Sequence, residues 1–219
     1  MAHRFINRIE AGQLLAERLQ NYAGRLGVVV LGLPRGGVPV AGEIARSLGA
    51  PLDVIVVRKL GVPCQEELAM GAIAPGGVCV LNDGLIESLG IEGDSIGAVR
   101  LKEERELQRR EKLYRGHRPP LALRGKIAIL VDDGIATGST MHAAVIFLHQ
   151  QDPARVVVAA PVIAPDTFRD LTASVDEVVA VIVPKELLSV GQWYDDFSAT
   201  SDEEVRRVLA GASPAGSDS

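Results

Sequence analysis

Two adjacent carboxylates, Asp132 and Asp133, end an apolar run of this chain and are followed at once by a small, hydroxyl-rich turn. A helix is expected after that turn. The first N–H groups of a helix are unpaired and carry the positive end of its dipole, which suits a phosphate. The carboxylates suit sugar hydroxyls or Mg²⁺, which shares its oxygen ligands with substrate phosphates. Phosphate and polyol groups bound side by side indicate a phosphorylated sugar.

A simpler interpretation of these residues needs no ligand. Thr137 or Ser139 would cap the helix, and the two aspartates would be solvated. A cap explains a hydroxyl in the turn, but it does not explain two carboxylates at the end of a buried strand. Their repulsion costs free energy unless a ligand or cation offsets it. Ligand binding is favoured, since ligands of open α/β sheets bind at the carboxyl ends of strands.

Glycines and cations follow two earlier apolar runs. Gly36 and Gly37 would let the backbone approach an anion closely, and Arg35 before them adds a fork-shaped donor. Arg58 and Lys59 follow the next run and suit a diphosphate. Both segments have ordinary alternatives, because paired glycines before a helix often form only a turn and most surface Arg-Lys pairs are solvated.

Aromatic side chains gather near the C-terminus. Trp193, Tyr194 and Phe197 are three of the eight aromatic residues of the chain and lie within five positions. The cluster fits a stacking platform for a planar ring as well as it fits a hydrophobic plug that packs the C-terminal helix. The sequence leaves these two interpretations open.

Alternating strands and helices must position these residues. Runs rich in Val and Ile predict strands at 28–31, 53–57, 127–131, 156–160 and 178–183. The segments between and around them predict helices at 10–26, 38–48, 139–150, 166–172 and 202–210. This alternation predicts an α/β fold with a parallel sheet covered by helices on both faces.

Two regions interrupt the alternation. Residues 60–82 are rich in Gly and Pro, which predicts a long loop or hairpin, and long loops in compact domains are usually functional or disordered. Residues 94–115 predict a charged helix with supporting i,i+4 pairs such as Glu106 and Arg110. Residues 211–219 have the composition of a disordered tail.

Composition bounds the class of protein. The chain has 219 residues, 47% of them hydrophobic, which suffices for one α/β domain with a full core. A net charge of −5 with interspersed signs argues against a nucleic-acid-binding face, and the two cysteines lack metal-ligand spacing. The N-terminus lacks the apolar core of a signal peptide, and no apolar run could span a bilayer. We therefore expect a cytoplasmic protein without nucleic-acid or membrane partners.

Residues 131–140, Val-Asp-Asp-Gly-Ile-Ala-Thr-Gly-Ser-Thr, closely resemble the phosphoribosyl pyrophosphate (PRPP) binding motif of type I phosphoribosyltransferases. Gly134 departs from the aliphatic residue usual after the acidic pair. Residues 32–39 resemble the pyrophosphate loop of the family, and residues 58–59 resemble the Arg-Lys pair before its flexible catalytic loop. The likeness extends over residues 12–197 and is strongest to a bacterial group described as predicted phosphoribosyltransferases.

The resemblance implies a single domain over residues 1–210. It would contain a five-stranded parallel sheet flanked by helices, a flexible loop, and a small C-terminal hood at about residues 184–199 that covers the acceptor. The implied reaction transfers ribosyl phosphate from PRPP to a nitrogenous base or another small-molecule acceptor, with Mg²⁺ as cofactor and pyrophosphate as product. Such an enzyme is a pentosyltransferase of nucleotide metabolism. Members of the family are commonly dimers, so a homodimer is implied as well.

The resemblance also assigns roles to residues. Asp132 and Asp133 would hold the ribose hydroxyls and contribute to a Mg²⁺ site, directly or through water. The 5′-phosphate would bind to Ala136, Thr137, Gly138, Ser139 and Thr140. Pyrophosphate would bind to Arg35, Gly36, Gly37, Arg58 and Lys59. The residues implied to be catalytic are Arg35, Lys59, Asp132 and Asp133, and the hood would offer Trp193 and Tyr194 to the acceptor.

One position narrows the acceptor. In the enzymes of this family that use 6-oxopurines, an aspartate stands three positions after the second acid, and here that position is Ala136. Hypoxanthine and guanine are therefore disfavoured, and the acceptor stays open. The competing hypothesis is a PRPP- or nucleotide-binding regulatory protein of the same fold without turnover. Such regulators often add a helix-turn-helix or a basic face, and this chain has neither, which favours an enzyme.

Overall fold

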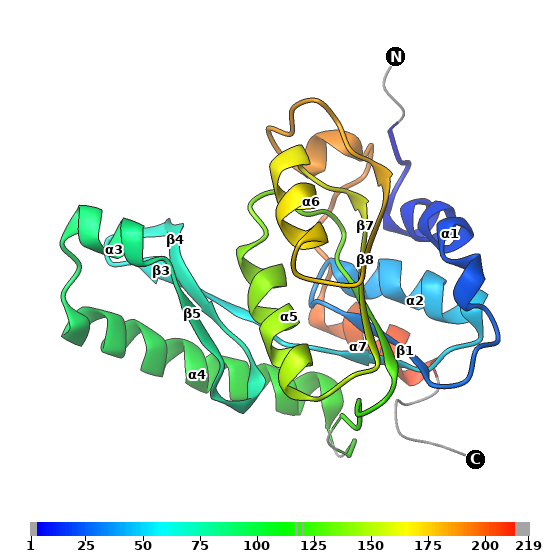
Figure 1. Ribbon diagram of the computed structural model, residues 1–219, viewed down its shortest axis with the longest axis horizontal. Coiled ribbons are helices and arrows are strands. Elements are labelled where there is room, and N and C mark those ends of the chain that lie inside the picture. Colours follow the sequence, from blue (N-terminus) through cyan, green and yellow to red (C-terminus); the bar gives the residue numbers. More distant parts are fainter. Residues whose placement is uncertain (1–3, 117, 120, 213–219) are drawn as a thin grey trace.

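The computed structural model of the protein describes residues 4–116, 118–119 and 121–212. Its central element is a parallel sheet of five strands in the order β2-β1-β6-β7-β8 (Figure 1). The strands are β1 (Val28–Gly32), β2 (Leu52–Val54), β6 (Ile127–Val131), β7 (Arg155–Val162) and β8 (Glu177–Ile182). The predicted α/β architecture is therefore present, and each predicted strand overlaps an observed one.

Helices cover both faces of this sheet (Figure 1). One face carries α1 (Arg8–Arg18), α2 (Gly37–Leu48) and α7 (Asp202–Ala210), and the other carries α5 (Ser139–Gln150) and α6 (Pro165–Thr172). Side chains of a strand alternate between the faces. In β1, Val30 packs in one core cluster with Ile44 of α2, whereas Leu31 packs in the other with Leu148 of α5. The described helices include none that is long and apolar enough to cross a membrane.

The first helix is shorter than predicted. It begins at Arg8 because the side chain of Asn7 accepts hydrogen bonds from the first free N–H groups, which is typical of a helix N-cap. After Arg18 the chain forms a 3₁₀ turn, η1 (Gln20–Tyr22), and then reverses at Gly24, whose φ is 67°. The predicted tail at 211–219 lies, apart from its first two residues, outside the described part of the chain.

A second unit projects from the core, and we call its residues 58–115 the arm (Figure 1). It contains an antiparallel three-stranded sheet and two helices: β3 (Arg58–Val62), β4 (Gln65–Ile73), η2 (Pro75–Gly77), β5 (Cys79–Leu81), α3 (Asp83–Leu89) and α4 (Gly93–Arg115). Residues 60–82 thus lie mostly in paired strands, so the structure has the hairpin of the two alternatives that the sequence left open, a loop or a hairpin.

A buried ionic contact anchors the arm to the core. Asp53 of β2 is 1% exposed, and its carboxylate accepts hydrogen bonds from Arg115, at the end of α4, at 3.1 and 3.2 Å. Arg118 lies 3.9 Å from the same carboxylate and donates to the carbonyl of Leu209 on α7 at 2.6 Å. Because the Asp53 carboxylate is shielded from water, its negative charge is stabilised by these two cations instead of by solvent.

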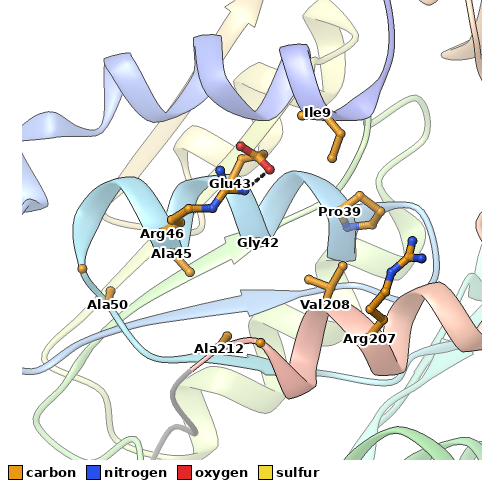
Figure 2. Close-up of a pocket in the computed structure, with 12 residues that line it drawn as sticks. Ile9, Pro39, Gly42, Glu43, Ala45, Arg46, Ala50, Arg207, Val208 and Ala212 are labelled. Atoms are coloured by element: carbon orange, nitrogen blue, oxygen red, sulfur yellow. Dashed lines mark hydrogen bonds and ion pairs between the residues drawn. The ribbon is translucent and has the colours of Figure 1, made fainter.

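A cavity of about 420 Å³ lies between α1, α2 and α7 (Figure 2). The helices around it pack closely, since a Cβ on Gly42 would lie 2.8 Å from Val208 Cγ1. Glu43 is 6% exposed and forms an ion pair with Arg46 at the wall of this cavity. None of the predicted site residues lines it, so the predicted site lies elsewhere.

Candidate active site

The acidic pair follows β6 at the carboxyl edge of the sheet. The N–H of Asp132 donates to the carbonyl of Ala159 on β7 at 3.3 Å, and the N–H of Asp133 donates to Oδ1 of Asp132 at 2.9 Å. Arg8 Nε lies 2.7 Å from Oδ2 of Asp133, and the two side chains are 12% and 14% exposed. Burial and the charge of Asp133 raise the pKa of Asp132 well above its usual value. These are not the two solvated aspartates of the simpler interpretation.

The turn after the acidic pair leads into α5. Its N-cap, Gly138, has a φ of 73°, and a Cβ there would lie 2.7 Å from Thr167 Cγ2, so both backbone conformation and space require glycine. The structure shows no side-chain hydrogen bond at this cap within the described residues, although Thr137 and Ser139 lie beside it. The first N–H groups of α5 therefore lack a side-chain cap, and this is the condition for an anion site.

Contacts from the β7–α6 segment hold the backbone of this turn. Ile135 is 3% exposed; its N–H donates to the carbonyl of Val162 and its carbonyl accepts from the N–H of Ala164, both at 2.9 Å. The Thr167 hydroxyl donates to the carbonyl of Ala136. The turn is thus fixed on its inner side before any ligand binds.

The loop after β1 packs directly on the acidic pair, because β1 and β6 are neighbours in the sheet. A Cβ on Gly36 would lie 1.9 Å from Oδ2 of Asp133, and one on Gly37 would lie 2.7 Å from the carbonyl oxygen of Val131. Gly36 has an ordinary φ of −61°, so it is needed for close approach alone. The N–H of Gly37 donates to the carbonyl of Leu33 at 3.0 Å. That amide is used within the loop in this structure, and the binding of pyrophosphate by Gly37 stays a prediction.

Arg35 lies on the outer side of this loop. Its side chain is 44% exposed, and Nη1 lies 4.0 Å from Oδ1 of Asp202 at the start of α7. Exposed pairs of this kind contribute little to stability, so the guanidinium can turn to an anion at low cost. The peptide bond between Pro34 and Arg35 is cis.

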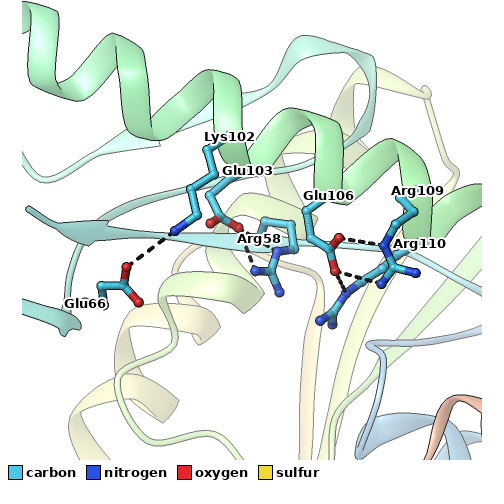
Figure 3. Close-up of polar contacts among 7 residues, drawn as sticks. All are labelled: Arg58, Glu66, Lys102, Glu103, Glu106, Arg109 and Arg110. Atoms are coloured by element: carbon cyan, nitrogen blue, oxygen red, sulfur yellow. Dashed lines mark hydrogen bonds and ion pairs between the residues drawn. The ribbon is translucent and has the colours of Figure 1, made fainter.

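Arg58 and Lys59 were predicted to end a strand of the parallel sheet. In the structure they begin β3 of the arm instead. Arg58 Nη2 lies 2.6 Å from Oε2 of Glu103 on α4 (Figure 3). Arg58 is therefore bound to the helix of the arm in this structure, which corrects its expected position beside the pyrophosphate loop. Lys59 lies opposite Ala72 of β4 in the strand register.

The arm meets the turn before α5, which is the predicted 5′-phosphate site, across a cavity of about 180 Å³. Ala72 and Asn82 line it from the arm, and Thr137, Ser139 and His142 line it from the turn and α5. Because Lys59 is the register partner of Ala72, it lies one strand away from this cavity. Movement of the arm would therefore change access to the predicted 5′-phosphate site.

The hood packs against the acidic pair and the N-terminal segment. Tyr194 is 2% exposed between the rings of Phe5, at 5.3 Å, and Phe197, at 4.9 Å, and its hydroxyl donates to the carbonyl of Asp133 at 2.6 Å. Burial and the charge of Asp133 raise the pKa of Tyr194. The prediction that Tyr194 stacks on the acceptor is corrected: it belongs to a plug, which packs the N-terminal segment and α1 instead of the C-terminal helix. Trp193 is partly buried beside it.

The hood also explains the unusual residue in the PRPP-like motif. A Cβ on Gly134 would lie 2.3 Å from Cγ1 of Val190, so the hood side chain takes the space of a larger residue. Glycine at this position is thus matched to the hood and leaves the acidic pair in place.

A family model described as phosphoribosyl transferase domain matches residues 6–190. The chain belongs to this family. Two curated relatives from Mycobacterium tuberculosis strains, named Putative phosphoribosyl transferase Rv0571c and MT0597, are each 48% identical over 205 residues, covering 94% of this chain and 46% of the relative. The chain thus spans about half the length of these relatives. The crystal structure of TT1426 from Thermus thermophilus is 43% identical, with a TM-score of 0.80 over 96% of this chain and 99% of that chain.

The phosphoribosyl transferase fold expected from the motifs is therefore confirmed. Its parallel sheet brings together the two loops that the motifs singled out, one after β1 and one after β6. Arg58 lies instead on the arm, and Tyr194 is closed within the hood. The roles of the individual residues in binding remain predictions.

The residues at the acidic pair fit a Mg²⁺ ion that is held largely by substrate. Within the described residues, no group of three or more His, Cys, Asp or Glu side chains is arranged to hold a metal ion. Mg²⁺ commonly binds through one or two carboxylates and takes its other oxygens from phosphates and water. Asp132 and Asp133 suit that limited role, directly or through water.

Two residues that contact the site, Arg8 and Thr167, were not predicted from the sequence. Arg8 lies 125 positions from its partner Asp133, and the predicted first helix began two residues after it. One signal was present: a cation at the first turn of a helix opposes the helix dipole and needs another reason to be there. Thr167 follows a Pro-Asp helix start and carried no distinguishing signal.

Proposed function

We propose that the protein is a Mg²⁺-dependent phosphoribosyltransferase that uses PRPP as donor. The observation that carries this proposal is the meeting of three features at neighbouring strand ends: the acidic pair, the uncapped start of α5, and the glycine loop after β1. Carboxylates recognise ribose hydroxyls, a helix start binds the 5′-phosphate, and the Arg35 loop faces the pyrophosphate.

The reaction is a substitution at C1 of the ribose. The bond from C1 to the pyrophosphate oxygen breaks, and its electron pair leaves with pyrophosphate. A nitrogen of the acceptor forms the new bond to C1 and releases its proton to solvent. Positive charge develops on the ribose ring in between, so the protein must stabilise the departing anion and exclude water.

The residues of this chain divide these tasks. Arg35 turns from Asp202 to the pyrophosphate, and the carboxylates of Asp132 and Asp133 orient the ribose. When bound, Mg²⁺ supplies positive charge against the leaving pyrophosphate. The arm closes over the phosphate-binding turn and brings Lys59 toward the reacting groups, which keeps water away.

The acceptor is a nitrogenous base or another small molecule. Ala136 stands where 6-oxopurine enzymes of the family carry an aspartate, so hypoxanthine and guanine are the least favoured bases. Trp193 is the aromatic residue of the hood that is still open to an acceptor role, because Tyr194 is enclosed.

A second candidate function is a PRPP-binding regulatory protein without turnover. Two observations favour it: Arg58 is occupied by Glu103, and Tyr194 is closed off by neighbouring rings. Both functions require PRPP binding, and only the first requires an acceptor.

The test is to incubate the purified protein with Mg²⁺, PRPP and a panel of nitrogenous bases and to follow pyrophosphate release. Turnover with one base establishes the enzyme and identifies its acceptor. The variant Asp132→Asn with Asp133→Asn should lower PRPP affinity by about 100-fold or more, because it removes both charged acceptors of the ribose hydroxyls.

The matched control is Asp166→Asn with Asp170→Asn, which removes two exposed carboxylates of α6 and should leave PRPP binding unchanged. PRPP binding without turnover on any acceptor would favour the regulatory protein. Absence of PRPP binding, or equal binding by the variant that lacks both acids, would contradict the proposal.

A further inference from the structure

The segment before α1 forms a clasp with the hood. The N–H of Phe5 donates to the carbonyl of Trp193, and the N–H of Asp195 donates to the carbonyl of Phe5, both at 2.8 Å. Arg4 Nη2 donates to the carbonyl of Tyr194 at 2.5 Å, and its Nε lies 3.2 Å from Oδ1 of Asp195. We call residues 4–8 together with 193–198 the N-terminal clasp. Its backbone hydrogen bonds at Phe5 place the first residue of α1 beside the acidic pair, and the contacts of Arg4 are added at its exposed edge.

Arg8 makes three contacts from this clasp. Its Nε donates to Oδ2 of Asp133 at 2.7 Å, and Nη1 donates to the carbonyl of Ser198 at 2.7 Å. The guanidinium also stacks over the ring of Phe197, 4.0 Å from the ring centre. Two donors directed at different acceptors, with the flat group on a ring, use the shape of arginine as well as its charge.

The position of Arg8 in α1 costs stability unless the contact with Asp133 offsets it. Arg8 is the first residue of α1, where a cation opposes the helix dipole. Its side chain is only 12% exposed, so it has also lost most of its contact with water. The helix does not explain this residue, whereas the carboxylate of Asp133 does.

Gly36 limits the same carboxylate from the other side. A Cβ at that position would lie 1.9 Å from Oδ2 of Asp133, so the carboxylate rests against the bare backbone of the glycine loop. The carbonyl of Asp133 is held in addition by the hydroxyl of Tyr194 at 2.6 Å. Asp133 is thus confined between Arg8, Gly36 and the hood, which restricts the orientations of its side chain.

We infer that Arg8 is a positioning residue for the ribose site. This inference rests on the proposed function, in which Asp133 accepts hydrogen bonds from the ribose hydroxyls of PRPP. Arg8 binds Oδ2, fixes the direction of the carboxylate, and reduces its repulsion with Asp132. The site is then preorganised, since Asp133 need not reorient when PRPP arrives. Arg8 itself acts through Asp133 and makes no contact with substrate.

The test compares Arg8→Met with Arg4→Met in the full chain, using PRPP and pyrophosphate as separate probes in the presence of Mg²⁺. Both variants remove one arginine of the N-terminal clasp, and only Arg8 contacts Asp133. We expect Arg8→Met to lower PRPP affinity by about 10–100-fold, as loss of the partner of a ligand-binding group commonly does. Pyrophosphate, which has no ribose, should bind with unchanged affinity, and Arg4→Met should bind both probes like the unmodified protein.

Arg8→Lys keeps the charge without the two-pronged donor, so we expect PRPP affinity between that of Arg8→Met and the unmodified protein. In the Asp133→Asn background, Arg8→Met should cause little further loss, because the two residues act through one contact. The unfolding temperatures of all variants are measured as well, to show whether a loss of PRPP affinity is accompanied by a loss of stability.

The inference is overturned if both Arg8 variants bind PRPP like the unmodified protein. Equal loss of PRPP and pyrophosphate binding, or additive losses in the double variant, also overturns it, because either result marks a general structural effect. Failure of the unmodified protein to bind PRPP overturns the proposed function itself. A normal unmodified protein with unaffected Arg8 variants overturns the role of Arg8 alone.

Discussion

The parallel core and the arm differ in how much apolar burial and how much ion pairing stabilise each of them. In the core, β1 is buried along its whole length, and apolar clusters on both faces of the sheet pack the helices. In the arm, α4 buries only three of its 23 residues; Leu107 packs in the apolar cluster that contains Leu60 and Met70 of the strands, and ion pairs add further contacts between the helix and the strands (Figure 3). Arg58 binds Glu103 at 2.6 Å, and Lys102 lies 3.4 Å from Glu66 with side chains that are 69% and 81% exposed.

Because of this difference, we expect the core to bind the substrate and the arm to close over it. A close-packed apolar core resists small displacements, so the loops after β1 and β6 keep their geometry. The exposed pair of Lys102 and Glu66 is weak and screened by salt, so the outer part of the arm can change its shape at low cost, while the contacts of Asp53 hold its base on the core. The motifs that we expect to bind ribose and phosphate accordingly lie on the core, and the segment that we expect to close over them lies on the arm.

The largest expected effect comes from adding one carbon to the core side of the site. In Gly36→Ala the new Cβ would lie only 1.9 Å from Oδ2 of Asp133, so the carboxylate must move. We expect transfer activity, measured as pyrophosphate release, to fall by about 100-fold, because a displacement of about 1 Å at a reacting site has that effect.

The matched control adds the same carbon to the arm. A Cβ on Gly97 of α4 would meet nothing within 4 Å. Gly97→Ala should keep full activity and stabilise the helix by up to about 1 kcal/mol. Equal activity in Gly36→Ala and Gly97→Ala would remove the distinction between a tight core site and a tolerant arm.

The contact between the two regions should give the next largest effect. Asp53→Asn leaves Arg115 and Arg118, whose side chains are 15% and 18% exposed, without their counter-charge, and we expect the free energy of unfolding to fall by about 3 kcal/mol. Urea unfolding measures this. Asp152→Asn is the control, because its pair with Arg124 is 3.6 Å apart and exposed, and it should change stability by less than about 0.5 kcal/mol. Similar losses in both variants would contradict the anchoring role of Asp53.

The smallest effect concerns acid and the arm. Hydrogen bonds from Arg109 and Arg110 lower the pKa of Glu106 from 4.5 to about 2. Since the folded-state pKa is the lower one, this contribution to stability is present above about pH 4.5 and is lost as pH falls through about 2. The group lies at the surface, so solvent screening limits its contribution to less than about 1 kcal/mol.

Hydrogen exchange of the α4 amides between pH 5 and pH 2, corrected for intrinsic rates, should show this loss, roughly as the linkage relation requires. Core amides of β1 should show a smaller change over the same range. Glu106→Gln should remove the dependence in α4. An unchanged pH course in that variant would assign the acid sensitivity of the arm to other carboxylates.

Most of the parallel core could be predicted, because most of its strands are apolar runs rich in Val and Ile that can be recognised without knowledge of their neighbours. The start of α1 was misplaced because its N-cap, Asn7, lies before the apolar periodicity begins. The arm was harder still. Its strands are interrupted by Gly and Pro, and only the pairing of residues 58–62 with 65–73 distinguishes strands from a loop.

The candidate site followed the same division. The acidic pair and the turn before α5 were found because they form one continuous motif on one strand and one helix. Arg58 and Tyr194 were misjudged because their partners, Glu103 and the Asp133 carbonyl, are 45 and 61 positions away. A motif of a few neighbouring residues does not include partners that are so far apart in the sequence.

The sequence by itself determined the parallel α/β core and the PRPP-like motif at the end of β6, because periodicity and contiguous motifs are properties of short segments. Only the tertiary structure decided which groups surround that motif. In the folded protein Arg8 contacts Asp133, Val190 packs against Gly134, and Arg58 pairs with Glu103 of the arm. The physical reason is that burial and charge pairing depend on residues far apart in the chain, which the folded sheet alone brings into contact.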